Sequence, residues 1–230
     1  MTAVLAAGAA IAVLGAVVAL AARDARVGLL GLLASMVGAM FIADPLPTAA
    51  IAWVRLSGAV LTVAILRAAI ATGRAGPAER GWTGRIHRVA PAGLGPVVLA
   101  LLGAAGAVIG LAIGTSISGV AGTAVTRLVD LATAPTLALG AAGAALAIAI
   151  GPALLGPTSA RRAMAGVLVV EAVELVSTGL GSSPGVLGEI GFATVLIAVA
   201  AGGAAAAAVG TAAGLSESAG VTAEEPATAS

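Results

Sequence analysis

Ionisable side chains inside long apolar stretches are the feature of this sequence that points most directly to chemistry. Glu171 and Glu174 interrupt the apolar run that begins at Val167. They are three positions apart, so a helix places both carboxylates on one face. In a medium of low dielectric, two neighbouring carboxylates are not easily ionised together. Such a pair can hold one proton and exchange it with a neighbouring group, which is the requirement for a proton relay.

Two further charges accompany this pair of glutamates. Arg55 lies about two turns into the apolar run 48–71, and Glu189 lies about one turn into the run 185–209. A buried arginine near the carboxylates would be a counter-charge that biases which of them stays ionised. Alternatively, both residues are close enough to the ends of their runs to reach the lipid headgroups with solvated or snorkelling side chains.

The residue types that are missing exclude several kinds of site. The chain has no Cys and no Lys, and His87 is its only histidine. Thiolate or multi-histidine metal sites, haem and iron–sulfur ligation, cysteine nucleophiles and lysine Schiff bases therefore cannot be built from this chain. A net charge of +1 gives no electrostatic basis for nucleic-acid binding. We expect no cofactor, no metal and no catalytic residue.

The elements that must position the buried charges are membrane helices. Of the 230 residues, 60% are hydrophobic and only 9% are charged. A soluble domain carries about 25% charged residues, because it needs them to cover its surface. The mean hydropathy of +1.15 agrees. The composition therefore predicts an integral membrane protein of the multi-pass type.

The apolar runs are long enough for about seven membrane-spanning helices, since one span needs about 20 mostly apolar residues. The fold class expected is thus all-α, a polytopic membrane helix bundle. The runs are 2–22, 27–44, 48–71, 96–115, 134–155, 163–181 and 185–209. The first run lacks a basic start and is longer than the apolar part of a signal peptide, so we expect it to be retained.

The arginines predict the orientation of the bundle. With seven spans, the first, third and fifth connections share a side with the C-terminus, and they carry eight of the eleven arginines. The opposite connections hold only Arg127. Because basic residues favour the cytoplasmic side, we expect the N-terminus outside and the C-terminus inside. The expected location is the inner (cell) membrane.

Several surface features have less specific interpretations. We expect the inner-side arginines to contact anionic lipid or a peripheral partner; these are Arg80, Arg85, Arg88, Arg161 and Arg162. Arg127 and Asp130 predict a short interfacial helix with a local ion pair. Gly106, Gly110 and Gly114 form a ridge that either packs against another helix or reflects only the abundance of glycine.

The chain divides into four regions. Residues 1–95 hold three spans and an inner loop, 96–133 a fourth span and an outer interfacial segment, and 134–212 three further spans. The acidic segment 213–230 is expected to be disordered, because it is rich in Ser, Thr, Ala and Pro from Leu215 onward.

The third region resembles a known family. Its basic pair Arg161-Arg162, the intramembrane Glu171 and the polar turn before a last apolar helix are similar to the K-type small subunit of bacterial complex I. A closer resemblance is to the hydrogenase-4 component E family of group 4 hydrogenase and formate hydrogenlyase complexes. Its final helix begins much like the segment from Leu187 to Thr194.

The resemblance is specific over 134–212, whereas the first 130 residues match only in hydropathy and helix number. Ala172-Val173 stand where the family often has Asn-Gly after the glutamate, and Val195 stands where it has Asp. Arg55 takes the place of a basic residue that is usually Lys. No second buried glutamate follows Glu189, which puts a complete proton pathway through this chain in doubt.

The resemblance implies a non-catalytic accessory subunit of a complex I-related redox complex. Its partners would be antiporter-like membrane subunits and peripheral redox subunits. Glu171, Glu174, Glu189 and Arg55 would contribute to proton translocation or charge coupling. Two other classes stay open: a self-sufficient transporter of ions or small solutes, and a structural scaffold whose charges fix helix register and partner contacts.

Overall fold

The computed structural model describes residues 2–42, 47–74, 95–117, 133–155, 158–181 and 185–221. These residues form helices and no strand, which confirms the all-α class within the described ranges. The helices are α1 (Thr2–Ala21), α2 (Ala25–Met40), α3 (Ala49–Arg74), α5 (Pro96–Ile117), α7 (Ala134–Leu155), α8 (Ser159–Gly179) and α9 (Val186–Val221).

Each apolar run of the sequence is a helix, with boundaries close to the predicted ones. Five helices, α1, α3, α5, α7 and α9, are long and apolar enough to cross a membrane. Helix α2 is shorter, with 16 residues. Helix α8 has 21 residues but carries Arg161, Arg162, Glu171 and Glu174. The chain is therefore compatible with a multi-pass membrane protein.

The predicted span 185–209 agrees with the apolar part of α9, Val186–Val209, but the helix itself continues beyond this part to Val221. The interpretation of the chain as disordered from Leu215 onward therefore does not hold for residues 215–221. Alanine has the highest helix propensity of all residues, and the many alanines after Gly203 sustain the helix although the hydropathy falls. Residues 222–230, and the predicted pair of Arg127 with Asp130, lie outside the described residues.

Local signals account for the helix ends near the buried charges. Asp24 caps α2 by accepting a hydrogen bond from the backbone N–H of Arg26 at 2.9 Å. Thr158 caps α8 in the same way, accepting from the N–H of Arg161 at 3.2 Å. At the other end of α8, Gly181 has φ of 80°, the left-handed conformation that terminates many helices. This turn directs the chain into α9.

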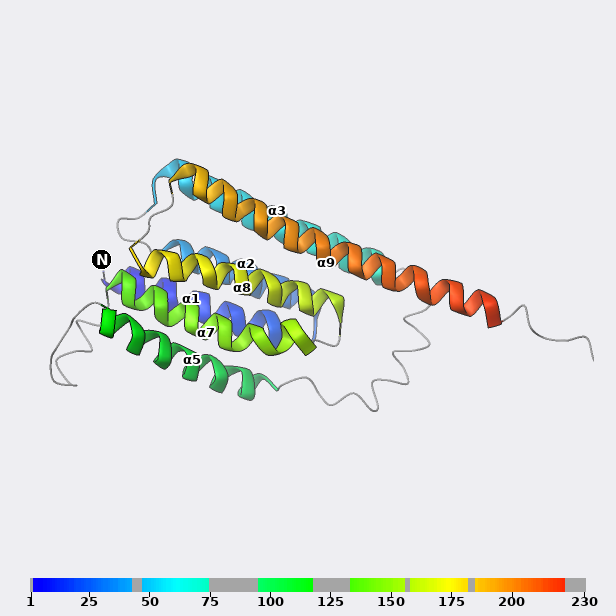
Figure 1. Cartoon of the computed structure of the whole chain (residues 1–230), viewed down its shortest axis with the longest axis horizontal. Coiled ribbons are helices and arrows are strands. Elements are labelled where there is room, and N and C mark those ends of the chain that lie inside the picture. Colours follow the sequence, from blue (N-terminus) through cyan, green and yellow to red (C-terminus); the bar gives the residue numbers. More distant parts are fainter. Residues whose placement is uncertain are drawn as a thin grey trace, which may run out of the picture.

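Consecutive helices run antiparallel along one common axis (Figure 1). Helices α3 and α9 lie together along one side, α1, α2, α7 and α8 form the middle, and α5 lies at the opposite edge. The regions 1–95 and 134–212 thus pack against each other rather than forming separate units. Helices α3 and α9 both begin at one end of the bundle, here named the cluster end. The connections from α1 to α2 and from α7 to α8 lie at the other, the Arg-rich end, which carries Arg23, Arg26, Arg161 and Arg162.

The glycine ridge of α5 is a helix contact. Gly106, Gly110 and Gly114 are buried and face α7. A Cβ added at Gly106 would meet the backbone carbonyl oxygen of Gly143, and one added at Gly110 would meet that of Leu139. Small residues let two membrane helices approach this closely, so that van der Waals packing holds them together. The interface interpretation of the ridge is therefore confirmed.

Apolar side chains fill most of the bundle around the buried charges. Toward the Arg-rich end, one core joins residues of all the described helices and includes Leu32, Leu66, Ile148 and Leu168. A second core consists mainly of alanines of α1, α2, α7 and α8, and it includes no residue of α3 or α9. The buried charges are gathered at one place beside these cores.

Candidate functional site

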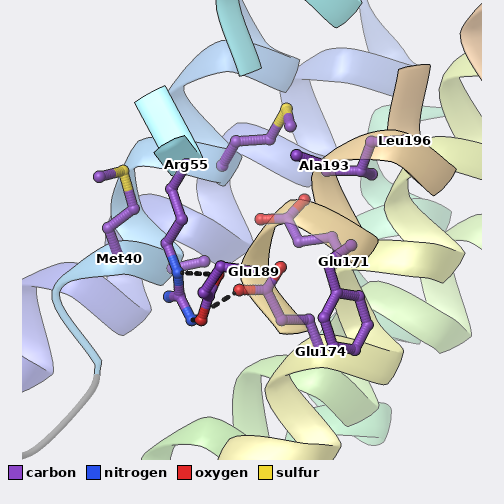
Figure 2. A pocket seen from close by; sticks show the side chains of 10 residues that line it. Met40, Arg55, Glu171, Glu174, Glu189, Ala193 and Leu196 are labelled. Carbon is purple, nitrogen blue, oxygen red and sulfur yellow. Dashed lines mark hydrogen bonds and ion pairs between the residues drawn. The ribbon is translucent and has the colours of Figure 1, made fainter. Parts of the chain in front are cut away.

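The four charged residues that the sequence analysis found in apolar runs lie around one small cavity. Arg55 comes from α3, Glu171 and Glu174 from α8, and Glu189 from α9 (Figure 2). The cavity has a volume of about 30 Å³. Its other lining residues are apolar: Met36, Ala39, Met40, Phe192, Ala193 and Leu196. Three helices thus bring all four charged groups together at one level of the bundle.

Arg55 binds two carboxylates from two different helices. Its Nε donates a hydrogen bond of 2.7 Å to Oε2 of Glu189, and its Nη2 donates to Oε1 of the same residue. This is the two-bond geometry in which a planar guanidinium matches a carboxylate best. The same Nη2 lies 2.8 Å from Oε1 of Glu174. One cation is therefore shared between two anions, and the three residues are called the Arg55 cluster below.

Glu171 is held differently. The hydroxyl of Ser35 on α2 lies 3.1 Å from each carboxylate oxygen of Glu171. A hydroxyl has one hydrogen, so it donates to one of these oxygens at a time. Within the described residues Glu171 forms no ion pair. A buried carboxylate without a cation is costly, and adding a proton removes that cost. Glu171 is therefore suited to hold a proton rather than a fixed charge.

The burial of these groups decides between the two interpretations of Arg55 and Glu189. The side chain of Glu189 is 2% exposed and that of Arg55 is 12% exposed. Neither reaches outward as a snorkelling side chain would. Glu174 is 14% exposed, and Glu171 is 3% exposed. All four side chains are mostly enclosed by protein, which favours the interpretation of Arg55 and Glu189 as buried charges over that of solvated or snorkelling side chains.

The local sequence explains why these side chains meet. The turn after Gly179 is short, so the last turns of α8 and the first turns of α9 are neighbours, and Glu174 comes beside Glu189. Helix α3 packs along α9 from the same end, which places Arg55 against both carboxylates. The spacing of Glu171 and Glu174 gives them a common helix face, as the sequence predicted.

Ser35 is the site residue that the sequence did not reveal. It lies in an apolar stretch of α2 and is 1% exposed. A serine within a membrane helix is common enough that its type alone is a weak signal. The one signal in the sequence is that a buried hydroxyl requires a hydrogen-bond partner. The sequence does not show which helix supplies that partner.

The arginines expected to contact lipid or partners are only partly described. Arg161 is half-buried, and its Nη2 donates a hydrogen bond of 3.2 Å to the backbone carbonyl of Ala22, which follows the last residue of α1. A cation at a helix C-terminus satisfies a free carbonyl and complements the helix dipole. Arg162 is exposed. Arg80, Arg85 and Arg88 lie outside the described residues, as does His87.

The site combines one cation and three acids on three helices. In the described part of the chain, no group of three or more His, Cys, Asp or Glu side chains is arranged to hold a metal ion. The acids instead divide into two that face Arg55 and one that faces a hydroxyl. This arrangement separates the three ion-paired residues of the Arg55 cluster from Glu171, whose carboxyl has a hydroxyl as its hydrogen-bond partner.

Comparisons with known proteins give no relative for this chain: no family model, no curated protein and no solved structure matches it.

Proposed function

We propose that this chain is a non-catalytic accessory subunit of a membrane complex, in which buried carboxylates take part in proton translocation. The observation that supports it is the convergence of Arg55, Glu171, Glu174 and Glu189 around one small cavity. Ionisable side chains at membrane depth are costly, and they are typical of ion pathways and proton relays. Three helices here supply four such groups to the same place.

The chemistry divides between the two parts of the site. Arg55 is the fixed positive charge, and the carboxylate of Glu189 binds it through two hydrogen bonds. Glu174 competes for the same guanidinium nitrogen. A proton that moves from Glu171 to Glu174 weakens the contact of Glu174 with Arg55, so proton position and ion pairing are linked. Such a linkage is what charge coupling between neighbouring subunits requires.

The proposal includes seven spans, with the N-terminus outside and the C-terminus inside the inner (cell) membrane. Helices α2 and α8 lie side by side with long apolar helices (Figure 1). The charges that set α8 apart are Glu171 and Glu174, enclosed in the bundle, and two arginines at its Arg-rich end. Basic residues at that end favour the cytoplasmic side.

The proposed assembly is a complex I-related redox complex of the hydrogenase-4 or formate hydrogenlyase kind. The support is the resemblance over 134–212, a stretch that corresponds to α7, α8 and most of α9. The partners would be antiporter-like membrane subunits, with peripheral redox subunits on the inner face. This chain would join them without holding a cofactor.

The first experiment is a pull-down of the tagged full chain from its native membrane in a gentle detergent, with mass spectrometry of the proteins retained. We expect antiporter-like membrane subunits and an iron–sulfur or nickel–iron protein. A chain that purifies alone, as a stable monomer or homo-oligomer, would contradict the complex and favour a self-sufficient transporter.

The second experiment tests the relay with Glu171→Gln, measured as proton pumping by the complex in sealed vesicles. We expect assembly to be retained and pumping to be lost or strongly reduced, because an amide cannot release the proton. The control is Glu224→Gln, the same chemical change in the acidic segment. Unchanged pumping in Glu171→Gln would show that Glu171 is not in the proton path.

A structural scaffold is the second candidate, and one observation favours it. The Arg55 cluster ties α3, α8 and α9 together through ion pairs, as a purely structural network would. The two candidates differ at Glu171. In a relay the infrared carbonyl band of its protonated carboxyl changes with pH in the working range, whereas in a scaffold the band is constant.

A further inference from the structure

The surroundings of Glu171 differ on its two sides along the bundle. On the side of the cluster end lie the cavity and the Arg55 cluster. Arg55 and Glu174 each keep more than a tenth of their side-chain surface exposed, so they lie where the cavity approaches the outside of the chain. Met40 and Phe192, also half-buried, line the same cavity.

The cavity is large enough for water. A water molecule needs about 10–15 Å³ of accessible volume and two to four polar partners. The volume of about 30 Å³ therefore accommodates up to about two molecules. The carboxylates of Glu171 and Glu174 and the guanidinium of Arg55 supply the polar partners. Water here would connect Glu171 by hydrogen bonds to the partly exposed groups.

On the side of the Arg-rich end, Glu171 meets tightly packed apolar side chains. The next turn of α8 toward that end holds Val167 and Leu168, both fully buried. Leu32 of α2 and Ala200 of α9 are also fully buried in the same core. Close-packed apolar interiors leave few spaces as large as a water molecule. These side chains are all apolar and supply no polar atoms for a hydrogen-bonded path.

One buried hydroxyl interrupts this apolar core. Thr62 of α3 is fully buried, and its Oγ1 has no hydrogen-bond partner within the described residues. It lies two turns beyond Arg55 on the same helix face, toward the Arg-rich end. The side chains around it are apolar, so one hydroxyl does not make a continuous hydrogen-bonded path across this core.

We propose that Glu171 exchanges protons with the cluster end of the bundle alone, through the cavity, and is sealed from the Arg-rich end by the apolar core. This inference rests on the proposed role of Glu171 and adds the direction of access. A proton bound there returns to the same side, unless a neighbouring subunit offers a second route. The chain is then one half of a path, and transfer across the whole membrane requires a partner.

The absence of native cysteine makes the direction measurable, because single cysteines can be introduced without background. Silver ions reach thiols through water-filled paths and replace the thiol proton, forming a sulfur–silver bond and releasing H⁺. The full chain with Ser35→Cys is placed in sealed native-membrane vesicles of known orientation. Silver is added to one side and removed as chloride, and the remaining free thiols are labelled with a maleimide after denaturation.

We expect Ser35→Cys to lose its maleimide labelling when silver is added at the cluster end and to keep it when silver is added at the Arg-rich end. Leu32→Cys, one turn away in the apolar core, should keep its labelling under both conditions. Arg26→Cys, exposed at the Arg-rich end, identifies the sides. Ser35 contacts Glu171 directly. Ala39→Cys, at a residue that lines the cavity itself, replaces Ser35→Cys if that variant fails to accumulate.

The proposal would be overturned if silver blocks maleimide labelling of the cysteine next to Glu171 when added at either side, when added at neither side, or only when added at the Arg-rich end. A reaction of Leu32→Cys from the Arg-rich end would also overturn it. The result is independent of the Glu171→Gln experiment. If access is one-sided but Glu171→Gln pumps normally, the relay role of Glu171 is wrong and the one-sided access stands. If access is two-sided and Glu171→Gln does not pump, the one-sided access is wrong and the relay role stands.

Discussion

Arg55 is the residue on which the two neighbouring carboxylates depend. Its guanidinium is shared by Glu189 and Glu174, and all three side chains are mostly enclosed by protein. Removing one member of a buried ionic group leaves the remaining charges without compensation. Removing all members together does not carry that penalty.

This asymmetry gives a prediction for Arg55→Met. We expect the free energy of unfolding to fall by about 3–5 kcal/mol, because two buried carboxylates lose their cation. The measurement is thermal or denaturant unfolding of the full chain in mild detergent. Arg67→Met, on the same helix but with an exposed side chain, is the matched control and should change stability little.

A second variant shows whether charge or shape causes the loss. Combining Arg55→Met with Glu174→Gln and Glu189→Gln removes all the charges of the cluster and should recover much of the stability. If Arg55→Met alone is as stable as the unchanged chain, the ion pairs shown in Figure 2 do not persist in the membrane.

At this scale the sequence identified the charged residues but not their pairing. Glu171, Glu174, Glu189 and Arg55 stand out because charge is rare in apolar runs. Which acid binds Arg55 depends on the rotation of each helix about its axis and on which helices are neighbours. The hydropathy of a sequence predicts neither of these. The sequence did not identify Ser35 for the same reason, because its hydrogen bond is to Glu171, a residue of another helix.

The contact between α5 and α7 is the clearest example of an element held by backbone proximity. A side chain at Gly106 would collide with the backbone of Gly143. Gly202 of α9 is also helical, but a Cβ there meets nothing within 4 Å. The two glycines therefore allow the same substitution to be compared in a tight and in an open environment.

We expect Gly106→Ala to lower the free energy of unfolding by about 1–3 kcal/mol, because the added methyl group overpacks the contact. Gly202→Ala should be neutral or raise it by up to about 0.5–1 kcal/mol, because alanine is the better helix former. Unfolding of the two variants in one detergent provides the comparison. Equal effects in both would contradict the close contact of α5 with α7.

Helix α9 shows that an apolar span and the helix that contains it can differ in length. The sequence predicted the span 185–209, and the apolar part of α9 is Val186–Val209, but the helix continues to Val221. Hydropathy reports the medium around a segment rather than its backbone conformation, and alanine-rich segments form helices in water as well. The start at Val186 was predictable because a glycine–proline break precedes it, whereas the end had no such signal.

For the whole molecule, the number of membrane crossings depends on α2 and α8, the two helices that are not among the five long apolar ones. Whether α2 crosses can be tested directly. Phe41 and Arg26 lie at opposite ends of α2, and both are exposed. We expect an impermeant maleimide added to intact cells to label Phe41→Cys and to label Arg26→Cys only after permeabilisation. Labelling of both positions from outside would show that α2 does not cross and that seven spans are too many.

The arrangement of the helices was less predictable than their number. Antiparallel neighbours follow from short connections, but the packing of α3 on α9 joins segments far apart in the sequence. No periodic pattern in either helix identifies its partner, because small residues occur on every face. The sequence therefore predicted which residues take part in the cluster, but not that they would meet at one location.

The length of α9 has a consequence for whatever docks beside it. Its 36 residues extend about 54 Å, whereas the hydrocarbon core of a bilayer is about 30 Å thick. With Val186 at one boundary, roughly 20 Å of continuous helix projects beyond the other, past the ends of its neighbours (Figure 1). Such a rod acts as a spacer. A peripheral protein approaching the membrane at this point would be kept at a fixed stand-off from the lipid, or would have to provide a groove for the rod.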